Sequence, residues 1–147
     1  MLIYLDMCCL KRPFDDQSQP RIRLETAAVL GLLALEDDRV RFVRSAALSL
    51  ENRLNPVRER AARVEQWLAT APLWRPADDR SVQSRIGELM ALGLKNFDAL
   101  HVVSAEEAGA EIFATTDDRL ISVSTRNGAR LRTRVCSVLQ RAAEVSA

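Results

Sequence analysis

The sequence of 147 residues is long enough for one domain of ordinary size, and its 48% hydrophobic and 28% charged residues are typical of a globular protein. No apolar run reaches the about 18 residues of a membrane-spanning helix, and residues 1–10 lack the basic segment of a signal peptide. The odd cysteine count and the lack of paired CxxC motifs argue against a disulfide framework or a zinc site. We therefore expect a single cytoplasmic domain over residues 1–147, with no membrane partner.

The first half of the chain predicts strands and helices in alternation. Residues 2–5, LIYL, form a short apolar run that ends at Asp6 and indicates a buried strand. The proline, aspartates and serine of residues 11–20 predict a loop. A second strand is expected over 40–43, and Ser45 is expected to cap the helix that follows it. The helices predicted from apolar spacing cover residues 21–36, 46–54 and 57–69.

The second half continues this alternation. After a short strand or extended piece at LWRPA, Asp78 or Asp79 is expected to cap a helix that Gly93 ends, and Asn96 is expected to cap the next. The remaining predicted elements are a strand over 111–116, a short helix from Asp118, a strand over 133–138 and a C-terminal helix. Strands separated by helical segments of roughly ten or more residues indicate an α/β fold with a parallel sheet. Because the apolar runs do not alternate, both faces of this sheet are expected to be covered.

Two aspartates follow predicted strands that lie far apart in the chain. Asp6 comes directly after the strand at 2–5, and Asp117 comes directly after the strand at 111–116. In an open parallel sheet the active cleft lies beyond the carboxyl ends of the strands, so both carboxylates are expected at the same edge. The alternative is that Asp117 or Asp118 caps a helix, and this is the better interpretation for Asp118, although Asp118 takes the place of Asp117 if the strand ends one residue later.

Two further acids occupy helix faces that also carry apolar residues. Glu51 shares a face with Ala47 and Leu54 in a regular helix, and a carboxylate on such a face needs a partner, a proton or a metal ion. Asp98 lies on the same helix face as the apolar residues Val102 and Ala105, so we expect its side chain to point into the protein. The alternatives are that Glu51 is half-exposed at the helix flank and that Asp98 only favours the positive helix N-terminus.

Carboxylates gathered in this way cannot all ionise without compensation, and a divalent cation supplies it. Mg²⁺ and Mn²⁺ prefer hard oxygen ligands, and either ion can activate a water and stabilise charge on a phosphoryl group. The predicted metal ligands, which are also the candidate catalytic residues, are Asp6, Glu51, Asp98 and Asp117. The single histidine, His101, remains open as a core residue, as a group that supports a ligand or as an RNA contact.

The order of these acids resembles that of PIN-domain proteins, most closely the VapC-type ribonuclease toxins of bacterial toxin–antitoxin pairs. The motifs that carry the resemblance are IYLDMCC with Asp6, SAALSLENRL with Glu51, NFDALHVVSAEEAGAEIF with Asp98 and ATTDDRL with Asp117. Each motif is weak alone, but their order covers the chain from residue 2 to about 138. One departure is that Met7 and Cys8 stand where many relatives carry a small polar residue.

The resemblance implies a three-layer α/β/α sandwich, Mg²⁺ or Mn²⁺ as cofactor, and hydrolysis of RNA phosphodiester bonds. It also implies an antitoxin protein as partner and a possible homodimer, for which the apolar helix over 21–36 is a candidate surface, core packing being the alternative. Thr115 is expected to hydrogen-bond into the site. Lys11, Arg12, Arg53 and Arg119 are candidate phosphate contacts, with solvated surface positions as the alternative.

The adjacent cysteines are expected to pack as small apolar residues beside the site. Cys8 and Cys9 lack a histidine at a useful spacing, and the nearby acids disfavour a thiolate. A phosphatase of the haloacid-dehalogenase type, which also starts from an Asp after the first strand, is disfavoured because it needs a second Asp at position 8. The remaining alternative is an inactive PIN-fold module that binds RNA or protein.

Overall fold

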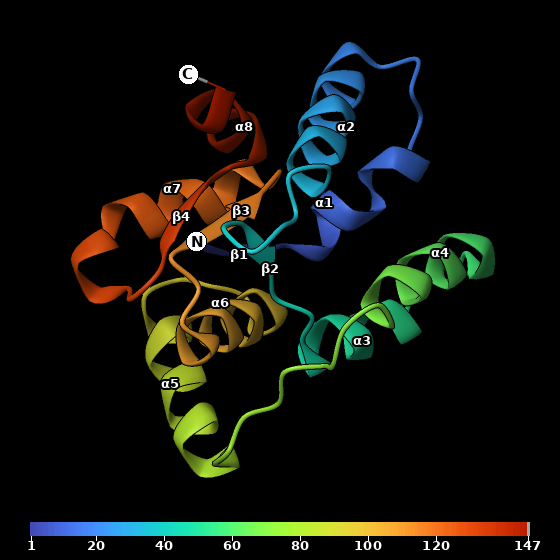
Figure 1. The fold of residues 1–147 in the computed structure, drawn as a ribbon. Helices are drawn as coiled ribbons and strands as arrows, with labels where there is room; N and C mark the ends of the chain where they lie inside the picture. Colours follow the sequence, from blue (N-terminus) through green and yellow to red (C-terminus); the bar gives the residue numbers. More distant parts are fainter. Residues whose placement is uncertain (147) are drawn as a thin grey trace.

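The computed structural model describes residues 1–146, and within this range one four-stranded sheet forms the centre of the fold (Figure 1). All its strand pairs are parallel, and the order across the sheet is β2-β1-β3-β4. The strands are β1 (Leu2–Leu5), β2 (Arg41–Phe42), β3 (Ile112–Thr115) and β4 (Arg134–Ser137). The first strand of the chain therefore lies inside the sheet, between β2 and β3, and the carboxyl ends of all strands share one edge.

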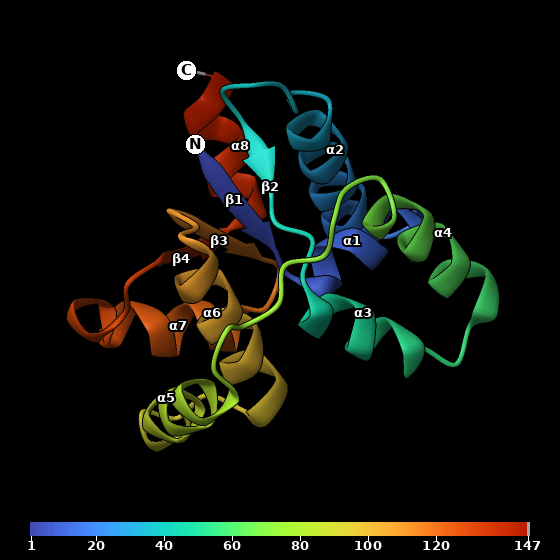
Figure 2. The ribbon, with the colours of Figure 1, turned by 60° about the horizontal axis from the view of Figure 1, so that its bottom comes forward.

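Helices cover both faces of this sheet, which confirms the predicted three-layer α/β/α fold with a parallel sheet (Figures 1 and 2). The α-helices are α1 (Met7–Lys11), α2 (Pro20–Leu33), α3 (Ala46–Arg53), α4 (Arg58–Leu68), α5 (Asp79–Ala91), α6 (Asn96–Ala108), α7 (Asp118–Arg126) and α8 (Val138–Ser146). Helices α2 and α8 lie on one face, α5 and α6 lie on the other, and α3 and α4 form an arm at the side. No helix within residues 1–146 is long and apolar enough to cross a membrane.

The two inner strands form the middle of the core. Ile3, Tyr4 and Leu5 of β1 are fully buried, as is Phe113 of β3. A strand covered on both faces has no solvated side, which explains the apolar runs without alternation. The Tyr4 and Phe113 rings stack with their centroids 5.1 Å apart, and this packing fixes a tyrosine hydroxyl inside the protein.

Local capping signals place several helix ends as predicted. The Ser45 side chain accepts the backbone N–H of Leu48 and caps α3, and Asp78 accepts the N–H of Arg80 and caps α5. Gly109 ends α6 with φ of +80°, a left-handed conformation that glycine adopts at little cost. The prediction for Asn96 is wrong: it is the first residue of α6, and the cap position belongs to Lys95.

Other predicted boundaries differ from the structure. Residues 11–20, predicted as a loop, include a 3₁₀ turn, η1 (Arg12–Phe14), directly after the short helix α1. The LWRPA segment forms only a single bridge, between Trp74 and Ser45, rather than a strand. Helix α2 ends at Leu33 and not at residue 36.

Candidate functional site

Asp6 is held between β3 and α1 at the carboxyl end of β1. Its backbone N–H donates to the carbonyl of Ala114, and its Oδ1 accepts the N–H of Met7 at 2.8 Å, which caps α1. Its Oδ2 accepts the hydroxyl of Thr115 at 2.7 Å and the thiol of Cys8 at 3.4 Å. Only 6% of the residue is exposed, so the carboxylate is fixed at the bottom of the site.

Asp117 lies beside Asp6 because β3 runs parallel to β1. Its side chain caps α7 by accepting the N–H groups of Arg119 and Leu120 at 2.9 and 3.2 Å. Its own N–H donates to the Thr115 hydroxyl at 3.1 Å, and this hydroxyl donates in turn to Asp6. The predicted contact of Thr115 with the acids is therefore present, and it links the two strand ends.

The prediction that Asp118 caps the helix is wrong, since Asp117 occupies the cap. Strand β3 ends at Thr115, so the aspartate two residues later stands just before the first turn of α7. Asp118 is exposed and pairs with both terminal nitrogens of Arg21 in α2, each at 2.8 Å. The structure therefore keeps Asp118 at the surface and Asp117 at the cluster.

Asp98 in the first turn of α6 completes the group of aspartates. Burial raises the pKa of this carboxyl to about 6, and the negative charges of Asp6 and Asp117 act in the same direction. Val102 and Ala105 below it on the helix are fully buried, which confirms the inward stripe. The site therefore gathers negatively charged groups from separate elements.

Glu51 approaches the same group from α3. Its charge is among the causes that raise the pKa of Asp98, and its Oε1 lies 3.5 Å from His101 Nε2. Ala47 is buried as predicted, but Leu54 is 64% exposed because α3 ends at Arg53 and Leu54 lies beyond the last turn. Glu51 itself is half-buried, so both the inward prediction and the flank alternative describe part of its position.

The four carboxylates suit a hard cation by chemistry, although they do not form a ready metal-binding group in this structure. In the described part of the chain, no three His, Cys, Asp or Glu side chains form a group that could hold a metal ion. All-oxygen donors and gathered negative charge nevertheless match Mg²⁺ or Mn²⁺. Binding would require Asp98 and Glu51 to approach Asp6 and Asp117.

A buried glutamate on α2 was missed by sequence reasoning. Glu25 is 1% exposed and lies 3.1 Å from Arg12 Nε and 3.3 Å from Arg21 Nε. Both arginines also bind the turn before Asp117: Arg12 donates to the Thr116 hydroxyl at 3.0 Å and Arg21 to its carbonyl at 3.2 Å. The signal that could have found it is helical spacing, since Glu25 continues the buried stripe of Ala28, Val29 and Leu32.

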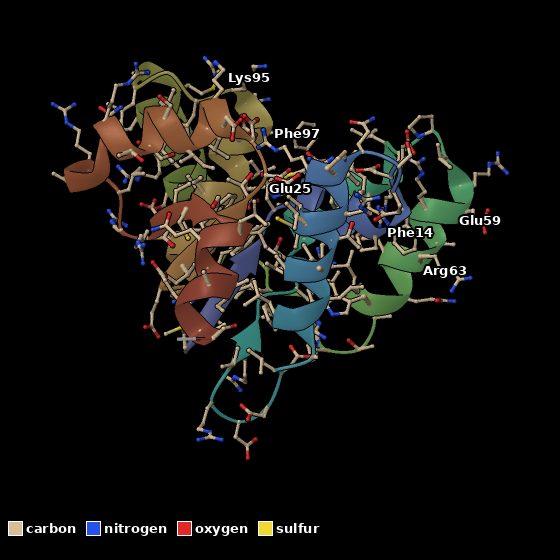
Figure 3. The ribbon with its side chains drawn as sticks, turned by 90° about the horizontal axis from the view of Figure 1, so that it is seen from above. Phe14, Glu25, Glu59, Arg63, Lys95 and Phe97 are labelled. Atoms are coloured by element: carbon tan, nitrogen blue, oxygen red, sulfur yellow. The ribbon has the colours of Figure 1, made fainter. Side chains whose placement is uncertain are left out.

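The candidate phosphate contacts differ in whether their side chains already bind other groups of the protein. Arg12 is engaged by Glu25, Asp15 and Thr116 and is therefore a structural residue in this structure. Arg119 donates to the carbonyl of Gly93, whereas Lys11 is half-buried and Arg53 is exposed. In Figure 3, Glu59 and Arg63 lie far out on α4, whereas Glu25 and Phe97 lie nearer the middle of the view.

The two cysteines differ in their surroundings. Cys9 is fully buried, and burial raises the pKa of its thiol well above the usual range, in agreement with an apolar packing role. The Cys8 thiol lies 3.3 Å from the Thr115 hydroxyl and 3.4 Å from Asp6. Cys8, unlike Cys9, therefore contacts the polar groups of the site.

The raised pKa of Asp98 predicts how stability changes with pH. The folded state holds this proton up to about pH 6, while the usual pKa is 3.8, so the contribution of Asp98 to stability is greatest below about pH 4 and is lost as the pH rises through 6. Replacing Asp98 with Asn should therefore stabilise the metal-free protein at about pH 8, by about 1 kcal/mol after solvent screening of this half-buried group.

Thermal unfolding in a chelator, at about pH 4 and about pH 8, checks the sign. The gain in Asp98→Asn should vanish at the lower pH. A loss of stability at the higher pH would instead favour a carboxylate that only stabilises the N-terminus of α6.

Comparisons with protein-family models, with curated proteins and with solved structures found no match to this chain.

Proposed function

We propose that the protein is a metal-dependent endoribonuclease that hydrolyses phosphodiester bonds in RNA with Mg²⁺ or Mn²⁺. The observation that carries the proposal is the convergence of Asp6, Glu51, Asp98 and Asp117 from separate elements at one edge of a parallel sheet. Ligand sites in such folds lie at this edge. Burial and the neighbouring negative charges raise the pKa of Asp98, and a bound cation would offset both effects.

Each carboxylate has a distinct task on this proposal. Asp6 and Asp117 are held by backbone N–H groups and by Thr115, so they form the rigid part of a metal site. Asp98 and Glu51 are half-buried, and both can rotate toward the cation. When bound, the metal ion would lower the pKa of a water and stabilise charge on the phosphate. With a pKa of about 6, Asp98 is mostly ionised at neutral pH and available as a ligand.

The resemblance of the ordered motifs supports a narrower proposal, a PIN-domain toxin of VapC type that acts in the cytoplasm and is held inactive by an antitoxin protein. Apolar side chains on the outer face of α2 support a protein partner or a second copy of the chain. Leu24 and Leu30 are 62% and 53% exposed there, and Leu35 follows beyond the helix end. A neighbouring reading frame for a small DNA-binding protein would support the antitoxin assignment.

The experiment is cleavage of a structured RNA and of a single-stranded RNA by the purified protein. We expect cleavage with Mn²⁺ or Mg²⁺ and none in a chelator. The Asp98→Asn variant should lose about 100-fold or more, because it removes a ligand from the cluster. Asp118→Asn is the matched control, since Asp118 is the adjacent surface carboxylate and should leave the rate nearly unchanged.

The alternative is a PIN-fold module that binds RNA or protein without catalysis. Calorimetric titration with Mn²⁺ separates the two: binding to the wild type that is lost in Asp98→Asn supports the enzyme. Equal cleavage by wild type and Asp98→Asn would show that a contaminant cleaves the RNA, and the proposal would fail.

A further inference from the structure

A buried chain of hydrogen bonds connects the N-terminus of α3 with the histidine of α6. The backbone N–H of Leu48 donates to Ser45 Oγ at 3.1 Å, and Ser45 Oγ lies 2.7 Å from the Tyr4 hydroxyl. The same hydroxyl lies 2.7 Å from Nδ1 of His101. Ser45, Tyr4 and His101 are fully buried, so these groups form hydrogen bonds with one another and cannot form them with bulk water.

The chain of bonds can run in two directions. If Ser45 Oγ donates to the Tyr4 oxygen, the single hydroxyl hydrogen of Tyr4 is directed at Nδ1, which accepts it. If Tyr4 donates to Ser45 instead, Nδ1 must donate to the Tyr4 oxygen. Burial raises the pKa of Tyr4 well above its usual value, so the hydroxyl keeps this hydrogen. A neutral imidazole with Nδ1 as acceptor carries its hydrogen on Nε2.

The opposite direction would place two acceptors against each other. His101 Nε2 lies 3.5 Å from Glu51 Oε1, and a bare nitrogen lone pair there would face a carboxylate. The nitrogen is buried and has no hydrogen-bond partner among residues 1–146. A buried donor without a partner is costly, and the carboxylate facing it is the acceptor at hand. At 3.5 Å the pair is slightly longer than a direct hydrogen bond.

The ring is fixed, whereas the carboxylate is adjustable. His101 is tilted by 60° against Tyr4 at a centroid distance of 5.8 Å, and it stacks on Phe97 at 6.2 Å. The side chain of His101 is 1% exposed and that of Glu51 is 27% exposed. A small rotation of Glu51 can therefore close the gap, while His101 stays in place.

We propose that His101 is a positioning residue: Tyr4 and Ser45 orient its ring so that Nε2–H faces Glu51, and this N–H holds the Glu51 carboxylate toward the acid cluster. The proposal rests on the proposed function only for the role of Glu51 as a metal ligand. The hydrogen-bond chain itself needs no metal ion. It explains how the histidine ring and the tyrosine hydroxyl obtain hydrogen-bond partners inside the core.

Nitrogen NMR of the metal-free protein tests the orientation. At about pH 8, where an ordinary imidazole is neutral, we expect the tautomer with hydrogen on Nε2 in the wild type. Glu51→Gln should move the Nε2–H signal, because the facing group loses its charge. Tyr4→Phe should reduce the tautomer preference, because Nδ1 loses its donor. A hydrogen on Nδ1 in the wild type, or an Nε2–H signal that ignores Glu51→Gln, would overturn the proposal.

Mn²⁺ affinity, measured by calorimetry, tests the consequence for the site. Tyr4→Phe and His101→Ala should each weaken binding by about 10-fold or more, the usual effect of losing a group that orients a metal ligand. His101→Gln should retain more affinity than His101→Ala, since its amide can donate near the position of Nε2. Ser124→Ala is the matched control, because this buried hydroxyl of α7 has no hydrogen-bond partner among residues 1–146.

The two proposals fail in different ways. Equal affinity of the wild type and Tyr4→Phe would overturn the positioning role and leave the metal site standing. A wild type that binds no Mn²⁺ would remove the proposed function, and the NMR result would then decide alone whether His101 orients Glu51.

Discussion

Asp6→Asn is expected to reduce Mn²⁺-dependent RNA cleavage by about 100-fold or more while leaving the fold intact. The substitution keeps an oxygen to accept the Met7 N–H, so the cap of α1 survives. In the wild type, the Thr115 hydroxyl donates to Asp6. In the variant, the introduced amide can instead donate to this hydroxyl. The expected loss of cleavage activity therefore results from the missing negative charge at the bottom of the cluster and not from altered packing. Cleavage rates and circular dichroism of both proteins measure the two effects.

A matched control for Asp6→Asn is Asp16→Asn, which changes the charge equally in an exposed turn after η1. This control should cleave RNA as the wild type does. Unfolding of Asp6→Asn would mean that the carboxylate is needed for structure, and undiminished cleavage would remove Asp6 from the site.

Glu25→Gln is expected to lower the free energy of unfolding by about 3 kcal/mol. Glu25 is 1% exposed, and its charge faces Arg12 and Arg21. The amide cannot offset two guanidinium charges, and it turns a donor toward one of them. Because the same arginines bind Thr116, the turn that carries Asp117 should also loosen. Urea denaturation measures the stability, and Mn²⁺ titration measures the effect on the cluster.

The comparison for Glu25 is Glu88→Gln. Glu88 pairs with Arg85 at 2.8 Å, but its side chain is 60% exposed, so its removal should cost about 0.5 kcal/mol or less. Similar losses in both variants would show that burial of Glu25 adds nothing to its ion pairs.

The parts of the fold predicted from sequence are those fixed by neighbours in the chain. The strand over residues 2–5, the Ser45 cap and the end of α6 at Gly109 depend on local apolar runs, a hydroxyl and a glycine conformation. The placement of Asp6 and Asp117 at one edge followed from the parallel sheet alone. The order of the four motifs led to the same acids.

The errors arose where distant residues decide the outcome. Whether Asp117 or Asp118 caps α7 depends on where β3 stops pairing, and Arg21 of α2 then binds Asp118. Burial of Glu25 depends on Arg12, which lies outside its helix. Leu54 is exposed because α3 stops one residue earlier than the periodic pattern suggests. No local window contains these contacts.

The interior place of β1 in the sheet has a consequence for synthesis of the protein. While the ribosome makes the middle of the chain, β1 can pair with β2 but its other edge stays open, since its partner at Ile112 does not yet exist. Asp6 lacks Thr115 until that time as well. At about 5–20 residues per second, the nascent chain passes several seconds in this state. Pairing between such distant segments is also slow to form. The acid cluster is thus completed only after β3 and Asp117 have been made and β3 has paired with β1.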